Sequence, residues 1–181
     1  MTELNFHWKA EWITPRLTMA VGSVILKWAM VDADFTSMAR SFWFKDHPEE
    51  RMPQSFTRRS KNFIQSVGKL YHLEPEEFRQ FCWFVHRMRI AASKRDDLAH
   101  SKPGLVKRNG REYEGLWIEH PSAATRTIEM SVIDIEMLAE EISSLHVESG
   151  QVGMALHVAA QVAALREKYQ IRQLSVGCCR Q

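Results

Sequence analysis

The sequence predicts a mainly α-helical fold, an up-and-down bundle of four to five helices with a small β-hairpin insertion between the third and fourth helices. Apolar residues recur every three or four positions through several long segments, which is the period of an amphipathic helix. An Asn-Gly pair at 109–110 separates two short segments without that period, and this pair is a strong hairpin signal. The chain has 181 residues, 45% of them hydrophobic and 25% charged, which suits one globular domain and excludes a disordered or collagen-like chain.

The first two helices are predicted at about 14–45 and 53–71. Thr14 followed by Pro15 is typical of a helix start, because threonine caps free N–H groups and proline fits the first turn. Prolines at 48 and 53 indicate a turn between the two helices. The core face of the first helix is predicted to contain Leu17, Val21, Val24, Trp28, Val31, Phe35, Met38 and Phe42.

The third helix is predicted from Pro75 to about Ala99. Its apolar residues keep the helical spacing up to that point. Pro103 and Gly104 follow, and a helix does not continue through them, because proline lacks the N–H group and its ring clashes with the preceding turn. The residues just after Ala99 are therefore expected to leave the helical geometry.

The β insertion is predicted at about 105–130. Asn109 and Gly110 both tolerate the left-handed backbone that a two-residue hairpin turn requires, so two antiparallel strands are expected on either side of them. A His-Pro pair at 120–121 ends the second of these strands. The segment 125–130 is a candidate for a third strand.

The last helix is predicted to begin after Ser131. Ser131 and Asp134 have the spacing of a capping box, in which each side chain satisfies an N–H group of the first helical turn. Gly150 and Gly153 suggest a break or kink, because glycine is the poorest helix former after proline. The Ala-rich segment 154–173 is then expected to form a further helix.

The predicted organisation is an N-terminal arm at 1–13, one helical domain at 14–173 and a C-terminal tail at 174–181. The three cysteines do not form a disulfide framework or a metal-binding pattern, so a reducing, cytoplasmic location is expected. The longest uncharged apolar stretch, 17–26, is about half as long as a bilayer requires. A soluble protein without a membrane partner is therefore expected.

The middle of the chain is basic. The segment 51–111 carries 14 Lys and Arg residues against 5 Asp and Glu residues, although the whole chain has a formal net charge of only +2. Such a segment can bind the phosphates of a nucleic acid, and it can equally be a solvated face of a helical protein. The candidates for contact with an RNA backbone are Arg87, Arg89, Lys94, Lys102, Lys107, Arg108 and Arg111.

The candidate site lies at the end of the third predicted helix, where Arg95, Asp96 and His100 fall close together. On a continuous helix Arg95 and His100 would be rotated by about 140° from each other, but the Pro-Gly exit is expected to let His100 approach the Arg95 face. A histidine can take up or release a proton, an arginine can hold two phosphate oxygens, and Asp96 can orient either group. RNA cleavage by its own 2′-hydroxyl needs these groups and no metal. Because one histidine transfers one proton at a time, a homodimer with two copies of Arg95 and His100 around one phosphate is favoured.

At these residues the sequence resembles the HEPN superfamily. The hallmark of that family is an arginine, usually followed by a polar residue, with a histidine after a gap of four to six positions, at the end of a helix in an up-and-down bundle. Arg95 and His100 match with a gap of four, and the string resembles the Arg-Asn-x-x-Ala-His-Gly form of many bacterial members. Asp96 stands where Asn is commoner, and Ser101 stands where Gly is commoner. The similarity of plan covers about 14–172, whereas only the motif itself is specific.

The resemblance implies a metal-independent endoribonuclease that acts as a homodimer, in the role of a toxin or phage-defence effector. Arg95 and His100 would be catalytic, and Asp96 would support them. The resemblance also implies an alternative, because the family includes members without activity that bind a protein, nucleotide or RNA. The expected partners are RNA, a second copy of the chain and an antitoxin or other protein, and no cofactor or metal is expected.

Several residues have both a functional and a structural interpretation. Asp32 borders the apolar stripe of the first helix, so it can support Arg95 or His100, or it can simply reach water. Tyr113 and Trp117 on the hairpin can stack on bases or pack on the bundle, and packing is the simpler interpretation. For the motif itself, the structural alternative is a helix C-terminus whose free carbonyl groups bind cationic side chains.

Overall fold

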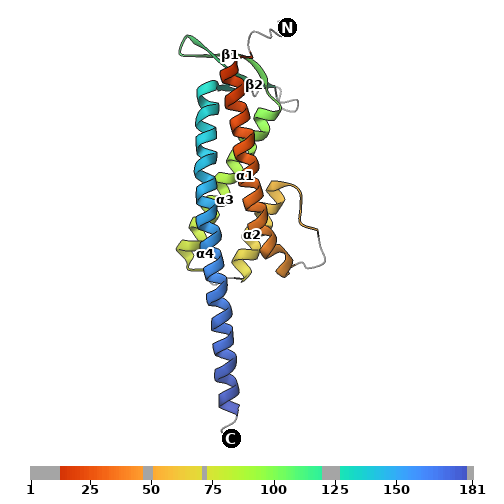
Figure 1. The fold of residues 1–181 in the computed structure, drawn as a ribbon, viewed down its shortest axis with the longest axis vertical. Coiled ribbons are helices and arrows are strands. Elements are labelled where there is room, and N and C mark those ends of the chain that lie inside the picture. The colour runs from red at the N-terminus through yellow and green to blue at the C-terminus, as the bar shows by residue number, and fades with distance from the viewer. Residues whose placement is uncertain (1–12, 47–50, 71–72, 120–126, 179–181) are drawn as a thin grey trace. The chain divides into compact units, whose positions relative to one another are not determined.

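The computed structural model describes residues 13–46, 51–70, 73–119 and 127–178, which form four helices and one antiparallel sheet (Figure 1). The predicted fold class is confirmed: the chain is mainly helical, with a small β insertion between the third and fourth helices. None of the helices in the described residues combines the length and the apolar character needed to cross a membrane. The elements are α1 (Pro15–Asp46), α2 (Phe56–Leu70), α3 (Pro75–Ala99), β1 (Lys102–Arg108), β2 (Arg111–Glu119), β3 (Thr127–Ser131) and α4 (Val132–Cys178).

The chain divides into two compact units. Unit 1 comprises residues 1–30 and 90–144, and unit 2 comprises residues 31–89 and 145–181. Three helices, α1, α3 and α4, contribute one part to each unit. Residues 1–12 of the predicted N-terminal arm lie outside the described residues.

Unit 2 contains residues from all four helices, and three of these helices meet at a cluster of phenylalanines. Phe35 of α1 contacts Phe56 and Phe63 of α2 with ring centroids 4.9 and 5.3 Å apart. Phe63 in turn contacts Phe81 of α3 at 5.1 Å. The rings meet at tilted or edge-to-face angles, the arrangement that aromatic pairs prefer. The aromatic cluster therefore joins α1, α2 and α3 of this unit.

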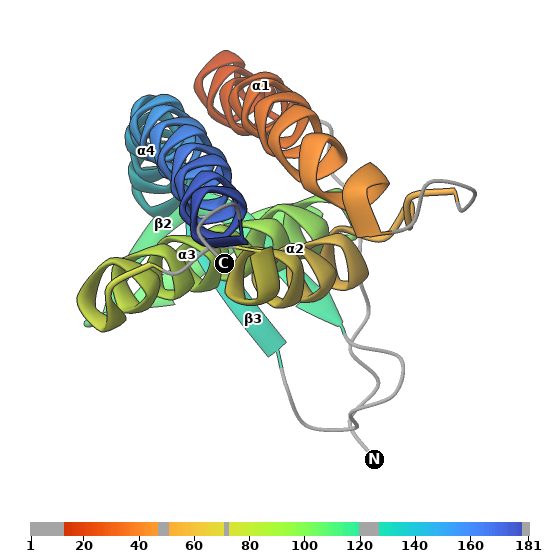
Figure 2. The ribbon, with the colours of Figure 1, turned by 90° about the horizontal axis from the view of Figure 1, so that it is seen from below.

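Polar contacts join α4 to the other helices of unit 2. Nδ1 of His146 on α4 lies 2.9 Å from Oδ2 of Asp34 on α1. The buried Ser149 donates a hydrogen bond to the same carboxylate at 3.4 Å. Nη1 of Arg87 on α3 lies 2.6 Å from Oε2 of Glu148 on α4. Figure 2 shows the four helices seen from one end, with α4 next to α1.

The β insertion in unit 1 is a three-stranded antiparallel sheet in the order β1-β2-β3. Asn109 and Gly110 have positive φ angles of 51° and 74°, as a tight two-residue hairpin turn requires, so the predicted hairpin is confirmed. β1 begins at Lys102, three residues earlier than predicted. Pro103 is tolerated there because β1 is an edge strand, where a missing N–H group need not break a hydrogen bond of the sheet.

The predicted caps of α1 and α4 are both present in unit 1. The N–H group of Leu17 donates to Oγ1 of Thr14 at 3.2 Å. Oε1 of Glu114, on β2, accepts from the same N–H group at 3.1 Å and from the Thr14 hydroxyl. At the start of α4, the hydroxyl of Ser131 donates to Oδ2 of Asp134 at 2.6 Å and accepts from its N–H group at 3.3 Å. The sheet is therefore tied to the start of α1 through Glu114.

α4 is one continuous helix from Val132 to Cys178, which decides the question that Gly150 and Gly153 left open: the break or kink that they suggested does not interrupt the helix. A glycine costs a helix interior only about 1 kcal/mol relative to alanine, which does not suffice to interrupt a helix that is packed on its neighbours. At Gly153 a Cβ atom would lie 3.1 Å from Sδ of Met38 on α1, so the glycine permits close packing. α4 continues to Cys178, past residue 174, where the C-terminal tail is predicted to begin.

A bidentate ion pair joins α1 to α4 in unit 1. Nε and Nη2 of Arg16 each donate to one carboxylate oxygen of Glu136, both at 2.8 Å. This hydrogen bonding lowers the pKa of Glu136 below its ordinary value of 4.5 and raises the pKa of Arg16. A second pair, between Lys27 and Glu140 at 2.8 Å, lies further along the same two helices.

Replacing Gly150 by alanine should stabilise the protein. A Cβ atom at Gly150 meets no atom within 4 Å, so the gain in helix propensity is expected to appear in full, at about 1 kcal/mol or about 2–4 °C in the midpoint of thermal unfolding. Gly153→Ala is the matched variant, and it should gain less because Met38 must move. A larger gain at Gly153 than at Gly150 would contradict the close packing of α4 on α1.

The ion pair of Glu136 should stabilise the protein only above the pKa of its carboxyl group. Because this pKa is lower in the folded chain than in the unfolded chain, the stabilisation is present above about pH 4.5 and is lost as the pH falls through the folded value. Thermal unfolding between pH 7 and pH 3 should therefore show a lower midpoint for Glu136→Gln at neutral pH, and this difference from the wild type should shrink as the pH falls below about 4.5. Glu167→Gln, at an exposed site on α4, is the control that should show no such trend.

Candidate functional site

The candidate site lies in unit 1, where α3 ends. The N–H group of His100 donates to the carbonyl oxygen of Asp97, and that of Ser101 donates to the carbonyl oxygen of Leu98, both at 3.2 Å. Both hydrogen bonds span three residues, so the last turn is tightened as in a 3₁₀ helix. The hydroxyl of Ser101 donates to the same Leu98 carbonyl at 2.6 Å. Ser101 therefore satisfies a carbonyl group that the end of a helix leaves free.

The tightened turn directs His100 away from Arg95. Residues three apart in a 3₁₀ turn lie above one another, so His100 lies over Asp97. Arg95 and Asp97 are rotated by about 200° on the helix, which places His100 on nearly the opposite side of α3 from Arg95. The expectation that His100 leaves the helix is confirmed. The expectation that it approaches the Arg95 face stays a prediction, which the backbone turn does not favour.

Arg95 faces α1 instead. Its guanidinium carbon lies 5.7 Å from the ring centroid of Trp28, which is buried in unit 1. Nη1 of Arg95 lies 2.8 Å from Oδ1 of Asp96. Nε of Arg95 is buried and has no hydrogen-bond partner among the residues that the structure describes. The side chain is 31% exposed, so the guanidinium is held by a ring and a carboxylate while part of it remains open to solvent.

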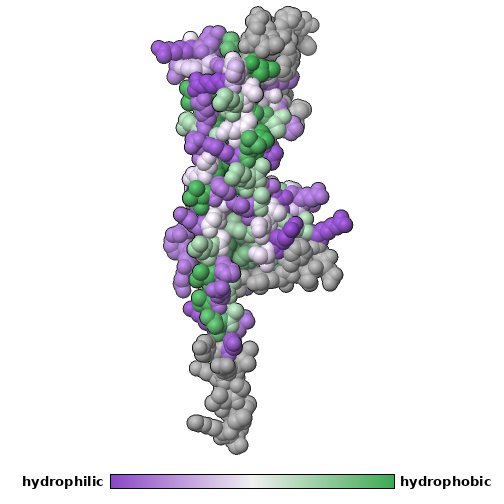
Figure 3. Space-filling model, viewed as in Figure 1, coloured by the Kyte–Doolittle hydropathy of each residue, from purple (hydrophilic) through white to green (hydrophobic). Residues whose placement is uncertain are grey.

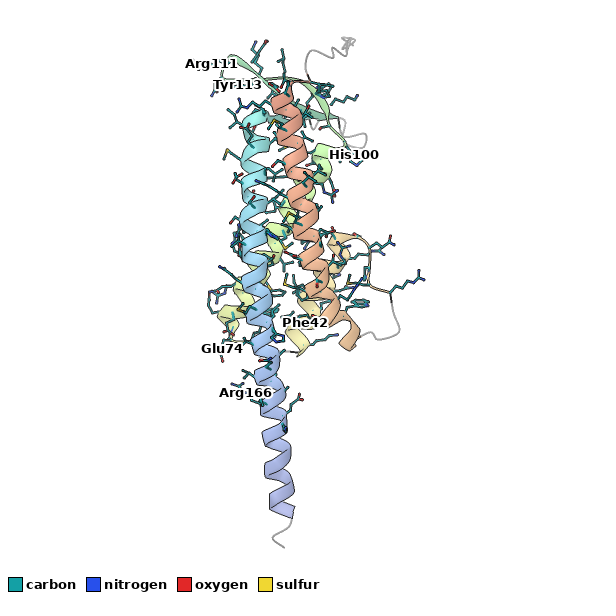
Figure 4. All side chains as sticks on the ribbon, in the orientation of Figure 1. Phe42, Glu74, His100, Arg111, Tyr113 and Arg166 are labelled. Atoms are coloured by element: carbon teal, nitrogen blue, oxygen red, sulfur yellow. The ribbon has the colours of Figure 1, made fainter. Side chains whose placement is uncertain are left out.

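His100 is exposed, and Figure 4 labels it where α3 ends. Within the described part of the chain, no hydrogen bond or ion pair joins its ring to Arg95 or Asp96. An exposed imidazole can reach a large substrate such as an RNA backbone without a pocket. Of the three predicted catalytic residues, the structure therefore brings Arg95 and Asp96 together and leaves His100 separate.

Two of the predicted RNA-contacting lysines already have neighbours within unit 1. Nζ of Lys94 lies 3.6 Å from Oε2 of Glu141 on α4. Nζ of Lys102 lies 5.7 Å from the ring centroid of Trp117, which is on the neighbouring strand β2. Trp117 also lies over the backbone of β1, because a Cβ atom at Gly104 would be 2.8 Å from its Nε1 atom. These contacts favour the interpretation of Trp117 as a packing residue.

The hairpin carries two of the predicted basic residues on either side of its turn. Lys107 and Arg111 lie on either side of the turn, and both are exposed. Figure 4 labels Arg111 and Tyr113 on the hairpin, and Figure 3 shows a hydrophilic surface there. The side chain of Arg108 lies outside the described part of the structure. Lys107 and Arg111 are therefore the best-placed candidates to contact a polyanion.

Asp32 has a partner that the sequence analysis did not single out. It accepts a hydrogen bond from Nη2 of Arg59 on α2, whose side chain is only 9% exposed. Arg59 also donates to the carbonyl oxygen of Gln54, and its guanidinium carbon lies 5.8 Å from the ring centroid of Phe56. The signal was its position three residues after Phe56 and four before Phe63, on the apolar face of α2. Asp32 therefore neutralises a buried arginine in unit 2, and support of the motif by Asp32 stays a prediction.

A groove lies away from the motif, between α1 and α4 of unit 1. Its volume is about 420 Å³. The ion pairs of Glu136 and Glu140 bridge the same two helices. The surface of the groove is therefore partly charged and partly apolar. Its lining consists of Ala20, Ser23, Ile133, Glu136, Met137, Ala139 and Glu140.

Comparison with known proteins adds no family to this description. Protein-family models, curated proteins and solved structures contain no match to the chain. In the described residues, no group of three or more His, Cys, Asp or Glu side chains is arranged to hold a metal ion. The function is therefore argued from the geometry of the side chains themselves.

Arg95→Ala should destabilise unit 1 as well as remove a positive charge. Loss of the contact with the buried Trp28 ring is expected to lower the free energy of unfolding by about 1–2 kcal/mol, whereas Arg95→Lys keeps the charge and should lose less. Denaturant unfolding measures the difference. Arg89→Ala, at an exposed position of α3, is the control, and its effect should stay within about 0.5 kcal/mol. If Arg95→Ala and Arg89→Ala lowered the free energy of unfolding equally, the stabilising role of the contact between Arg95 and Trp28 would be contradicted.

Proposed function

We propose that this chain is a metal-independent endoribonuclease whose active site is formed by two copies. The observation that carries the proposal is the combination of an exposed imidazole at an open helix end with a half-buried arginine fixed on the same helix. His100 is free to meet a substrate, and Arg95 is oriented by Trp28 and Asp96. The exposed Lys107 and Arg111 on the hairpin add positive charge for an RNA backbone.

The proposed reaction is attack of a ribose 2′-hydroxyl on the adjacent phosphate. A neutral His100 takes the proton of the 2′-hydroxyl, the 2′-oxygen bonds to phosphorus, and the bond from phosphorus to the 5′-oxygen breaks. A protonated His100 from the second copy gives a proton to the leaving 5′-oxygen. The products are a 2′,3′-cyclic phosphate and a 5′-hydroxyl. The guanidinium of Arg95 stabilises the negative charge of the pentavalent phosphorane through its paired N–H donors.

The turn at the end of α3 supports a site made from two chains. One chain offers one histidine of the motif, and the backbone turn holds it on nearly the opposite side of α3 from Arg95. A second copy would supply the other proton-transfer group and would allow the arginine of one chain to act with the histidine of the other. Asp96 would act as a positioning residue, because it contacts Arg95 at 2.8 Å.

A second candidate is a noncatalytic module that binds RNA, a nucleotide or a protein. The contact of Arg95 with Trp28 favours it, because that contact gives the arginine a structural role of its own. In this function the hairpin with Lys107 and Arg111 would supply the binding surface, and the motif would only end α3. The two candidates differ in one respect that is simple to measure, namely turnover.

Cleavage of RNA should require His100, and its rate should not change when a chelator is added. A labelled structured RNA incubated in EDTA with the purified chain is expected to yield fragments with 2′,3′-cyclic phosphate ends. His100→Ala should lower the rate by about 100-fold or more, which is the usual contribution of a general acid or base. Arg95→Lys, which keeps the fold better than Arg95→Ala, should lower it by a similar factor because a lysine lacks the paired donors.

The matched control for this assay is His86→Ala, since His86 is also exposed on α3 but is not part of the motif. This variant should cleave at the wild-type rate. Undiminished cleavage by His100→Ala would exclude the proposed chemistry. Binding of RNA without cleavage by any variant, including the wild type, would favour the noncatalytic module.

A further inference from the structure

The C-terminal part of α4 in unit 2 has little packing of its own. Leu156 is the last buried residue of the described part of this helix, and the side chains from His157 to Lys168 are exposed or half-buried. Figure 1 shows this part of α4 without a neighbouring helix or strand. An isolated helix of this length is marginally stable in water. Contact with a further surface would therefore stabilise it.

One face of this segment is mainly apolar, with the exposed Gln151 as a polar residue within it. The apolar residues of this face are exposed, from 42% for Val162 to 71% for Met154. At about 100° per residue, all of them lie within about 40° of Val158 around the helix. Figure 3 shows hydrophobic side chains at the surface of α4 just before its grey end. We call this set the α4 stripe, and it consists of Val147, Met154, Val158, Val162 and Leu165.

Part of the α4 stripe is arranged symmetrically about Val158, whereas Leu165 would face the polar Gln151 of an antiparallel second copy. Met154 and Val162 lie four residues before and after Val158, so each would meet the other if a second copy of the helix were laid alongside in the opposite direction. In that arrangement Val158 meets its own counterpart. Spacings of three, four and seven residues, as in this stripe, are those of a seam between two packed helices.

The charges beside the stripe favour an antiparallel pair. Glu148 and Arg166 both lie about 80° from Val158, on the same flank of α4. In an antiparallel pair related by a two-fold axis, a given flank of one helix lies beside the same flank of the other. Glu148 would therefore lie near the partner's Arg166, and the symmetry would produce this contact twice. Arg166, labelled in Figure 4, is exposed and has no ion-pair partner among the described residues, whereas Glu148 already pairs with Arg87 and has a second carboxylate oxygen.

A parallel pair would be opposed by the same charges. In a parallel pair opposite flanks face each other, and Lys168 lies about 80° from Val158 on the flank opposite to Arg166. Arg166 would then lie beside the partner's Lys168, offset by only two positions along the helix. Two positive charges would therefore meet on each side of the seam. The apolar stripe alone does not choose a direction, but these charges do.

We propose that the α4 stripe is a self-association surface, on which a second copy of the chain binds antiparallel about a two-fold axis at Val158. The occupant is the same stripe of the second copy, because Met154 and Val162 match each other about this point and the flanking charges complement each other only in this direction. The proposal does not rest on ribonuclease activity. It concerns α4 in unit 2, and it is tested by mass and by cross-linking without RNA.

The first test is the mass of the full chain in solution, measured by sedimentation equilibrium over a wide range of concentration. The wild type is expected to associate through the α4 stripe, in addition to the two-copy contact proposed at the motif. Val158→Glu places two carboxylates against each other on the axis and should weaken the α4 pair by about 100-fold or more. Glu167→Gln is the matched control, because Glu167 lies about 180° from Val158 on the opposite face, and it should leave the α4 pair unchanged. Circular dichroism checks that each variant is folded.

The second test establishes the direction of the pair. In a background with Cys82→Ser, Cys178→Ser and Cys179→Ser, a cysteine introduced by Val158→Cys should form a disulfide between two copies under mild oxidation. Leu165→Cys should not, because the two copies of residue 165 would be about 21 Å apart along the pair, beyond the reach of a disulfide.

Three outcomes would overturn the proposal. They are a monomeric wild type at every concentration, a mass of the assembly that Val158→Glu leaves unchanged, and efficient cross-linking through Leu165→Cys. A monomeric wild type would also contradict the two-copy ribonuclease site, whereas a smaller assembly that persists in Val158→Glu would indicate a second interface and would leave that site intact. Val158 and Leu165 lie on α4 and not in the motif, so RNA cleavage by the His100→Ala variant is a separate measurement.

Discussion

The end of α3 at Ala99 is the constraint on which the rest of unit 1 depends. Proline at 103 stops the helix, the last turn tightens, and β1 begins only three residues after Ala99. Because this connection is short, the hairpin stays close to the helices, and Glu114 of β2 reaches the first turn of α1. A carboxylate is stabilised at that position by the free N–H groups of the helix start. One helix end therefore sets the place of the sheet, the cap of α1 and the exposure of His100.

Each unit contains an arginine held against an aromatic ring and beside a carboxylate. In unit 2, Arg59 lies near Phe56 and binds Asp32, and its side chain is only 9% exposed. In unit 1, Arg95 lies near Trp28 and contacts an adjacent aspartate, but its side chain is 31% exposed. A nearly buried guanidinium serves packing alone, whereas a partly exposed one can also meet a phosphate. This difference in exposure, and not the presence of an ion pair, is what distinguishes Arg95 as a candidate for chemistry.

The surfaces available for partners differ in character between the units. The hairpin of unit 1 presents exposed basic residues, Lys107 and Arg111, which suit a polyanion. α4 in unit 2 presents apolar residues in a row, which suit another helix. Contact of the hairpin with RNA and pairing of α4 would then use separate parts of the molecule. Each could be altered by substitution without direct change to the other, since α4 beyond Leu156 carries no residue of the motif.

The sequence by itself determined the features that depend on residues close together in the chain. The helix limits, the Asn109-Gly110 turn and the Ser131 cap were all predictable, because each results from hydrogen bonds or steric limits within a few residues. Only the tertiary structure decided that α4 continues through Gly153, because that glycine packs on Met38, far away in sequence. The partners of Asp32 and Arg95 were likewise undetermined, since any of several helices could have supplied them. The motif was visible in the sequence, but the relative orientation of its residues depends on how the chain leaves α3, which the spacing of residues alone does not specify.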